Sequence, residues 1–210
     1  EPERPLVAII GGAKVSSKLG VIEALTDICD HIIVGGGIAN TFLAATGIET
    51  GNSLVEKDMI AVARNILESN KVNVPLPRDV MVAKELSQES EAVRKSVVDI
   101  EKDDQVLDIG PKTAQAYKSI IDSARTIIWN GPLGVFEIDQ FSRGTQALAL
   151  AVAENNSYTL VGGGDTVAVL EKYGIKDSVD YVSSGGGAFL EFIKSGTLLS
   201  LEAISRHAKS

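Results

Sequence analysis

The sequence has few of the residues that cross-link a fold or stack on bases. Its 210 residues include a single cysteine, Cys29, one tryptophan, and aromatic residues amounting to 5%. One cysteine cannot form an internal disulfide, so a hydrophobic core must hold the fold, and a chain of this length can bury one. With so few aromatic residues we find no platform for stacking single-stranded nucleic acid. We therefore interpret Cys29 as a core residue in a reducing compartment.

Positive charge is also in short supply. The chain has 20 Lys and Arg against 28 Asp and Glu, which gives a net charge of -8 and a pI of about 4.8. Its overall field repels nucleic acid and anionic membranes, so any anionic ligand must be held by local features. No apolar run approaches the ~20 residues of a membrane helix, and residues 1–5 do not resemble a signal peptide. We expect a cytoplasmic protein that binds neither nucleic acid nor membranes.

Several common signatures of catalysis and cofactor binding are missing. The only histidines are His31 and His207, so the sequence offers no Cys/His metal cluster and no support for acid–base chemistry by histidine. It contains no G-x-x-x-x-G-K-[ST] loop, and residues 35–40 do not match the G-x-G-x-x-G fingerprint of dinucleotide-binding domains. An NAD-dependent oxidoreductase is therefore disfavoured.

Short runs rich in β-branched residues alternate along the chain with amphipathic helical patterns. Most of the runs are apolar throughout, which is typical of parallel strands covered on both faces. The alternation predicts one α/β domain over residues 1–210, a doubly wound, mainly parallel, Rossmann-like sheet with helices on both faces. The expected strands are 6–10, 31–34, 72–76, 126–129, 158–161 and 180–183, and the expected helices are 19–28, 54–67, 113–124 and 145–153.

Residues 78–108 interrupt this alternation. Short strand signals at 80–82 and 97–98 lie on either side of a polar run, and an acidic turn follows at 101–104. This pattern predicts a small antiparallel excursion at one edge of the sheet. At the end of the chain, residues 198–210 are expected to form a short amphipathic helix.

Glycine is plentiful and clustered. Each cluster follows an expected strand and precedes a helix, as does the run WNGPLGVFE at 129–137. In open α/β sheets such turns meet at the carboxyl edge, where helix N-termini present free N–H groups and glycine lets a phosphate approach the backbone. One cluster alone is more often a tight turn, but together they predict a phosphate-binding rim. The clusters lie at 11–12, 35–37, 162–164 and 185–187.

Five charged or polar positions beside these turns are candidate ligand contacts. Lys14 and Lys18 are spaced i,i+4, so on a helical first turn they would grip one polyphosphate, although they could also be solvated surface lysines. Asp165 and Thr166 could simply cap a helix running from Thr166 to Glu171, but an Asp beside phosphates also suits Mg²⁺. Glu137 is either a surface carboxylate or an acceptor for ribose hydroxyls.

Six segments, taken in order, resemble phosphoglycerate kinase. They are GGAKVSSK at 11–18, VGGG at 34–37, DIGP at 108–111, WNGPLGVFE at 129–137, GGDT at 163–166 and SSGGGA at 183–188. The resemblance covers nearly the whole chain but corresponds only to the C-terminal, nucleotide-binding half of that two-domain family. It implies a glycolytic kinase that transfers a phosphoryl group reversibly between 1,3-bisphosphoglycerate and Mg-ADP, giving 3-phosphoglycerate and ATP.

The same resemblance implies roles for individual residues. Lys14 would contact the nucleotide phosphates, Lys18 the terminal phosphates and the transferring group, and Asp165 the Mg²⁺ ion. Glu137 would bind the ribose. Residues expected around the phosphates are Gly12, Ala13, Asn130, Gly163, Gly164 and Thr166; those expected around the adenine and sugar are Gly35, Gly36, Leu54, Gly110 and Pro132; and backbone donors to the transferring group are expected from Gly185, Gly186 and Gly187.

The family's other half has no counterpart in these 210 residues. In the family, an N-terminal domain holds the triose substrate and a hinge closes to bring both substrates together. We therefore expect this chain to bind adenine nucleotide but to turn over negligibly on its own. Family members are monomers, and the surface exposed in an isolated half favours self-association. The alternative is a stand-alone module that binds or senses adenine nucleotide.

Overall fold

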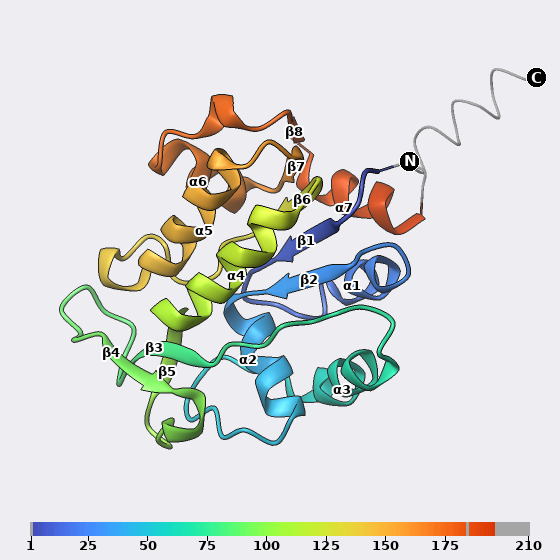
Figure 1. Cartoon of the computed structure of the whole chain (residues 1–210). Helices are drawn as coiled ribbons and strands as arrows, with labels where there is room; N and C mark the ends of the chain where they lie inside the picture. The colour runs from blue at the N-terminus through green and yellow to red at the C-terminus, as the bar shows by residue number, and fades with distance from the viewer. Residues whose placement is uncertain (1, 184, 196–210) are drawn as a thin grey trace, which may run out of the picture.

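The central sheet of the computed structural model, which describes residues 2–183 and 185–195, contains five parallel strands (Figure 1). Their spatial order is β2-β1-β6-β7-β8, so the order reverses between β1 and β6. A reversal of this kind is the switch point at which open α/β sheets bind ligands, beyond the carboxyl ends of the strands. The strands are β1 (Leu6–Ile10), β2 (His31–Val34), β6 (Thr126–Asn130), β7 (Tyr158–Gly162) and β8 (Tyr181–Ser183).

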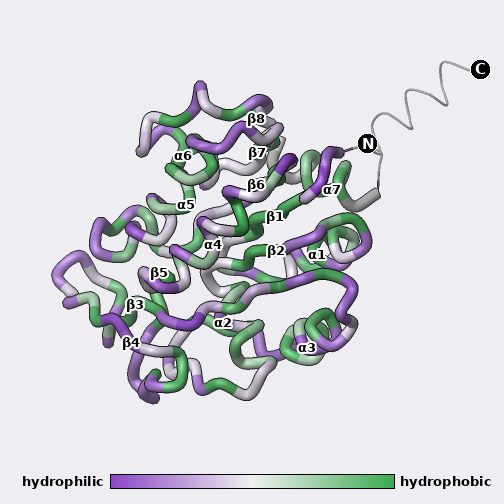
Figure 2. Tube along the Cα trace, in the orientation of Figure 1, coloured by the Kyte–Doolittle hydropathy of each residue, from purple (hydrophilic) through white to green (hydrophobic). Residues whose placement is uncertain are grey.

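Helices cover both faces of this sheet, which confirms the predicted doubly wound α/β fold. In β1, Val7 and Ile9 enter one core, and Ala8 and Ile10 enter the other. Because both faces of the sheet are buried, β1 is apolar throughout and β2 is apolar after His31, as the hydropathy along these strands shows (Figure 2). The first core is completed by α4 (Pro111–Ser123), α5 (Arg143–Glu154) and α6 (Gly164–Lys172), and the second by α1 (Leu19–Thr26), α2 (Gly36–Ala45), α3 (Ile60–Ser69) and α7 (Gly186–Ser195).

The antiparallel element expected near 78–108 is present, but as a separate sheet rather than at an edge of the first. Its order is β4-β3-β5, with β3 (Asp79–Ala83), β4 (Val93–Ser96) and β5 (Gln105–Ile109). The strand expected at 97–98 is wrong, because these residues lie in the 3₁₀ turn η2 (Val97–Asp99). The residues of β4 are mostly exposed, so this strand lacks the apolar pattern that would have revealed it.

Other boundaries also differ from expectation. Residues 72–76 do not form a strand: Asn73 makes one bridge to His31, and the prolines at positions 75 and 77 cannot donate ladder hydrogen bonds. The helix expected from residue 54 begins at Ile60, after the 3₁₀ turn η1 (Lys57–Met59). Two further 3₁₀ turns are η3 (Asp139–Phe141) and η4 (Lys176–Ser178). The helix expected at 198–210 lies outside the described residues.

Candidate functional site

Two turns meet at the switch point, one after β1 and one after β6. The Gly11 N–H donates a hydrogen bond to the Asn130 carbonyl at 2.9 Å, which ties the two turns together. A Cβ atom at Gly11 would lie 1.8 Å from the Pro132 carbonyl oxygen, so no other residue fits without moving the backbone. Gly131 has φ of 99°, a conformation that glycine adopts at little cost. The glycines therefore allow two backbones to pack closely where a ligand is expected.

A pocket of about 280 Å³ opens beside these turns. Its walls come from the loops after β1 and β6, from α2 and the loop after it, from the start of α6, and from β5 of the second sheet. The structure thus brings together seven of the residues expected around a nucleotide: Gly12, Ala13, Gly36, Leu54, Pro132, Glu137 and Asp165.

Lys18 places a positive charge between the two turns. Its ammonium donates hydrogen bonds to the carbonyl of Gly11 and, at 3.3 Å, to that of Asn130. Burial lowers the pKa of Lys18 from 10.5 to about 8, and the negative charge of Asp165 partly opposes that shift. The ammonium is thus poorly solvated and close to an acidic side chain, which favours its interaction with an incoming anion.

Lys14 lies apart from this arrangement. α1 begins only at Leu19, so the expectation that Lys14 and Lys18 share a helical first turn is wrong. The loop between them is held by Glu56, whose carboxylate accepts hydrogen bonds from the Ser16 N–H and hydroxyl, at 2.7 and 3.1 Å. The Lys14 side chain is exposed. Its ammonium is thus available to a ligand but is not fixed as that of Lys18 is.

The start of α6 shows that Asp165 is not a helix cap. The helix begins at Gly164 rather than at the expected Thr166, its N-cap residue is Gly163, and no side chain caps it. The Thr166 hydroxyl instead donates to the Gly162 carbonyl at 2.9 Å and accepts from the Gly131 N–H at 2.7 Å. Thr166 therefore joins this loop to the turn after β6, while the exposed Asp165 carboxylate lines the pocket.

Two further predicted residues, Asn130 and Gly35, support the loops around the pocket without lining it. The Asn130 side-chain amide is buried and donates to the Gly162 carbonyl at 2.6 Å, so it braces the backbone. A Cβ at Gly35 would lie 2.5 Å from a methyl carbon of Leu133, which shows how closely the N-terminus of α2 packs on the loop after β6. These residues set the positions of the loops rather than line the pocket.

Gly110 and the last glycine cluster are not brought into this pocket. Gly110 is the N-cap residue of α4, packs against the Asp79 carboxylate, and lines a different pocket. Gly185 is exposed just before α7, with its carbonyl accepting from the Phe189 N–H at 2.8 Å. Gly186 and Gly187 are the first two residues of α7.

The sequence reasoning missed several residues that line the pocket. The main ones are Val106 and Leu107 on β5, together with Gly37, Asn40, Gly134, Val135 and Phe136. The available signal was the apolar pair at 106–107 directly before the DIGP segment, but β5 was not recognised as a strand. It belongs to the second sheet, whose contact with the first the sequence does not reveal.

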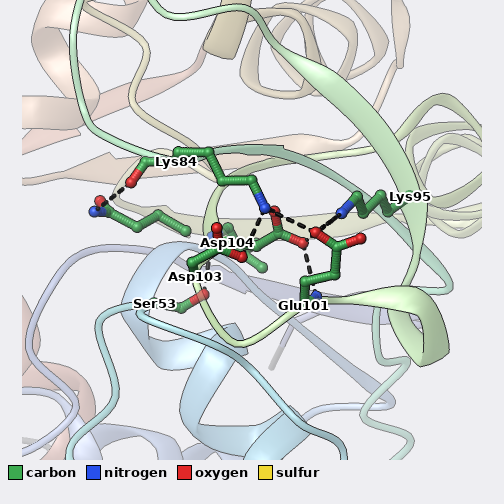
Figure 3. A network of polar contacts seen from close by, with 8 residues as sticks. Ser53, Lys84, Lys95, Glu101, Asp103 and Asp104 are labelled. Carbon is green, nitrogen blue, oxygen red and sulfur yellow. Dashed lines mark hydrogen bonds and ion pairs between the residues drawn. The ribbon is translucent and has the colours of Figure 1, made fainter.

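A network of charges fixes the loop that carries Leu54. Lys84 and Lys95 point at the carboxylates of Glu101, Asp103 and Asp104 (Figure 3). Asp104 is buried: its carboxylate accepts from Lys95 and from the Glu101 N–H, both at 2.7 Å, and its carbonyl accepts from the Asn52 N–H at 2.7 Å. Because lysines neutralise these carboxylates, we interpret the cluster as structural.

Replacing Asp104 with alanine is expected to lower the free energy of unfolding by roughly 1–3 kcal/mol, because the Glu101 N–H and both lysines lose a shared acceptor. Urea denaturation followed by circular dichroism measures this. Asp104→Asn keeps an acceptor but loses the charge, so its free energy of unfolding should lie between those of the wild type and Asp104→Ala. A matched change at the exposed neighbour, Asp103→Ala, should cost less than Asp104→Ala. Equal losses for both alanine variants would contradict the assignment.

Asp108 lies in the wall behind the pocket. Its carboxylate accepts hydrogen bonds from the N–H groups of Gly144 at 2.7 Å and Ile109 at 2.9 Å. A Cβ at Gly134 would lie 2.3 Å from this carboxylate, so the loop after β6 packs directly on it. Burial raises the pKa of Asp108 to about 7, although the two N–H groups favour the charged form. A buried acid that titrates near neutral pH therefore supports one side of the site.

Asp108 should make the protein less stable as the pH rises. Its folded pKa of about 7 lies above the ~3.9 of an unfolded Asp, so the folded state binds more protons between these values. The contribution therefore falls from about pH 4 to pH 7, by at most about 1.4 kcal/mol per pH unit. Urea denaturation at pH 4.5 and pH 8 should show that Asp108→Asn removes this component. Identical pH dependence in the two proteins would contradict it.

The residues present suit a magnesium-bound polyphosphate. Mg²⁺ usually takes one or two carboxylates together with substrate phosphates. Two exposed carboxylates line the pocket, Glu137 and Asp165, and Asp165 is the one within the field of Lys18. Around it are glycine turns and the N-terminal turn of α6, where the helix dipole favours negative charge. Neither histidine nor cysteine lines this pocket. The arrangement can position an anion and stabilise its charge.

Fold and site together define an open α/β domain with a glycine-rich ligand crevice at its topological switch point. The phosphoglycerate kinase family model matches residues 1–196, and the chain belongs to that family. Within the described residues, no helix is long and apolar enough to cross a membrane.

Two solved structures are similar over nearly the whole chain. Phosphoglycerate kinase from Coxiella burnetii is 46% identical, with a TM-score of 0.95, over 100% of this chain and 54% of that one. Phosphoglycerate kinase from Pyrococcus horikoshii OT3 is 31% identical, with a TM-score of 0.83, over 97% of this chain and 52% of that one. The chain therefore spans about half the length of either protein.

Proposed function

We propose that this chain is the C-terminal, nucleotide-binding half of a phosphoglycerate kinase and that it binds Mg-ADP and Mg-ATP in the pocket at the switch point. The observation that carries the proposal is a pocket lined by Asp165 and by glycine turns, with the Lys18 ammonium beside the lining residue Gly12 and within the field of Asp165. The family membership and the half-length match to two phosphoglycerate kinases support it.

In the proposed complex, the adenine and ribose lie against Leu54, Val106 and Leu107, with Glu137 accepting hydrogen bonds from the ribose. The phosphates extend toward Lys18, which neutralises charge on the terminal groups, while Lys14 contacts them from the exposed loop. Bound Mg²⁺ would screen the phosphate charge, with Asp165 as its protein ligand. Phosphoryl transfer needs mainly positioning and charge stabilisation, so the lack of a histidine at the pocket is no obstacle.

The reaction of the whole enzyme is reversible phosphoryl transfer between 1,3-bisphosphoglycerate and Mg-ADP. The chain alone is expected to bind nucleotide with negligible turnover, because it spans about half the length of the phosphoglycerate kinases it matches and the other half would hold the triose substrate beside the nucleotide. The last glycine cluster, Gly185 to Gly187, stands as a proposed source of backbone donors to the transferring group.

Calorimetric titration of the chain with Mg-ADP, ADP in EDTA, and NAD tests the proposal. Saturable one-to-one binding of Mg-ADP, weaker binding without the metal, and no binding of NAD are expected. A stand-alone sensor would show the same binding, so the chain should also be mixed with the separately expressed N-terminal half of the Coxiella burnetii enzyme. Recovery of kinase activity favours the enzyme half, whereas a folded chain that fails to bind Mg-ADP would refute the proposal.

Mg-ADP affinity is expected to fall as the pH rises through about 8. The pKa of Lys18 is lowered to about 8, so the free protein loses this charge above that pH, while the phosphates bind the charged form. The dissociation constant should rise by up to about tenfold per pH unit above 8. Calorimetry between pH 7 and pH 9.5 measures it. Lys18→Ala, which has nothing to titrate here, should show a flatter profile, and parallel profiles would contradict the assignment.

A further inference from the structure

A second and larger pocket, of about 400 Å³, lies outside the proposed nucleotide site. We name it the α4–α5 pocket, after the two helices that flank it beside strands β3 and β4. It shares no lining residue with the first pocket, and the proposed kinase chemistry does not use it. Its volume lies within the range of roughly 300–1,000 Å³ that is usual for small-molecule sites.

The floor of the α4–α5 pocket is apolar. Met81 and Ile109 come from the second sheet, Ala114 from α4, and Ala147 from α5. The two alanines leave the space that larger side chains would fill between two helices in contact. A floor of this kind accommodates the apolar body of a ligand, such as one aromatic ring.

The rim of the α4–α5 pocket is positively charged. Arg94, Lys118 and Arg143 all line it, whereas no Asp or Glu does, in a chain whose net charge is -8. Lys118 forms ion pairs with Asp122 at 2.8 Å and with Glu154 at 3.8 Å, and the Arg94 Nε lies 3.5 Å from the Asp79 carboxylate. Across residues 2–183 and 185–195, no hydrogen bond or ion pair involves the guanidinium of Arg143.

The position of Arg143 makes its charge more informative. It is the first residue of α5, where the helix dipole disfavours a cation. The neighbouring Gly144 N–H is already satisfied by the Asp108 carboxylate. Local stability therefore does not account for an arginine at this position. An anion bound between Arg143, Arg94 and Lys118 would account for it.

We propose that the α4–α5 pocket binds a small organic phosphate, with an apolar ring on the floor and a dianionic phosphate group at the rim. Guanidinium groups match phosphate oxygens in paired hydrogen bonds, and three cations suit a dianion better than a single carboxylate. Arg94 and Arg143 hold the phosphate from the sheet and the helix, and Lys118 adds charge from α4.

The test is a ¹H–¹⁵N NMR titration of the labelled chain with phenyl phosphate. Saturable shifts are expected at Gly110, Gly144 and Ala147, which line the α4–α5 pocket, and not at Gly12 and Gly36, which line the other one. Inorganic phosphate has the charged group without the ring, and phenol has the ring without the charged group. Each should bind at least fivefold more weakly than phenyl phosphate. Shifts confined to Gly12 and Gly36, or no saturable shifts in a folded protein, would overturn the proposal.

Variants sharpen this test. Arg143→Gln and Arg94→Gln should each weaken phenyl phosphate binding at least fivefold, and Ala147→Trp should abolish it by filling the pocket. Arg125→Gln, which removes an exposed arginine elsewhere, and Lys18→Ala should leave binding unchanged. Equal affinity in wild type and Arg143→Gln would refute the proposal. Each spectrum also reports whether its variant is folded, so an unfolded Ala147→Trp leaves the two arginine variants as the deciding pair.

Discussion

Replacing Lys18 with alanine is expected to weaken Mg-ADP binding by roughly 10- to 100-fold while leaving the free energy of unfolding unchanged or higher. The affinity loss follows from hydrogen bonds to charged groups, which contribute about 1.5–3 kcal/mol each, with 1.4 kcal/mol for every tenfold. Stability should not fall, because burial lowers the pKa of Lys18, which means that the folded state holds the charged ammonium at a cost. A residue kept at such a cost is more readily explained by a ligand than by folding.

A loss of Mg-ADP affinity without a loss of stability would distinguish a ligand-binding role of Lys18 from a structural one. Calorimetry with Mg-ADP at pH 7 gives the affinity, and urea denaturation without nucleotide gives the stability. Lys102→Ala is the matched control, because Lys102 is exposed on a turn of the second sheet, and neither quantity should change. A variant that loses stability and affinity together would show that Lys18 holds the turns after β1 and β6 in place, which its bonds to the Gly11 and Asn130 carbonyls also permit.

The sequence predicts the central sheet well because the pattern that identifies its strands is local. Five of the six expected strands exist, and most of their residues are apolar because helices cover both faces of the sheet. The exception, 72–76, has a suitable composition but contains a proline at position 75, so it forms one bridge and no strand. β4 was missed for the opposite reason, since an exposed strand needs no apolar residues.

The sequence predicts that glycine turns form the candidate site, but it does not predict which residues contact one another across these turns. The bond from Lys18 to the Asn130 carbonyl joins residues 112 positions apart, and no sequence spacing reports it. The sequence is compatible with Asp165 as a helix cap or as a metal ligand, and only the observed start of α6 rules out the cap. Val106 and Leu107 were missed because they enter the pocket from a second sheet.

Replacing Trp129 with alanine is expected to lower the free energy of unfolding by about 3–5 kcal/mol, a large part of the roughly 5–15 kcal/mol that holds a typical domain. Trp129 is fully buried in β6, between β1 and β7, and belongs to the core formed with α4, α5 and α6. Alanine would leave a large cavity there, which the surrounding close-packed side chains can fill only in part. Tyr158→Ala, on the next strand and half exposed, should cost far less.

Trp129 also shapes the site, because its indole N–H donates to the Gly131 carbonyl at 2.9 Å in the turn that binds Lys18 and Thr166. Trp129→Phe keeps much of the ring but removes this donor, so it should lose only about 1–3 kcal/mol while still weakening Mg-ADP binding. Trp129 is the sole tryptophan, so circular dichroism rather than fluorescence must follow the urea denaturation. If Trp129→Phe lost stability but bound Mg-ADP normally, the indole would serve the core alone, and the shape of the turn would depend on its glycines.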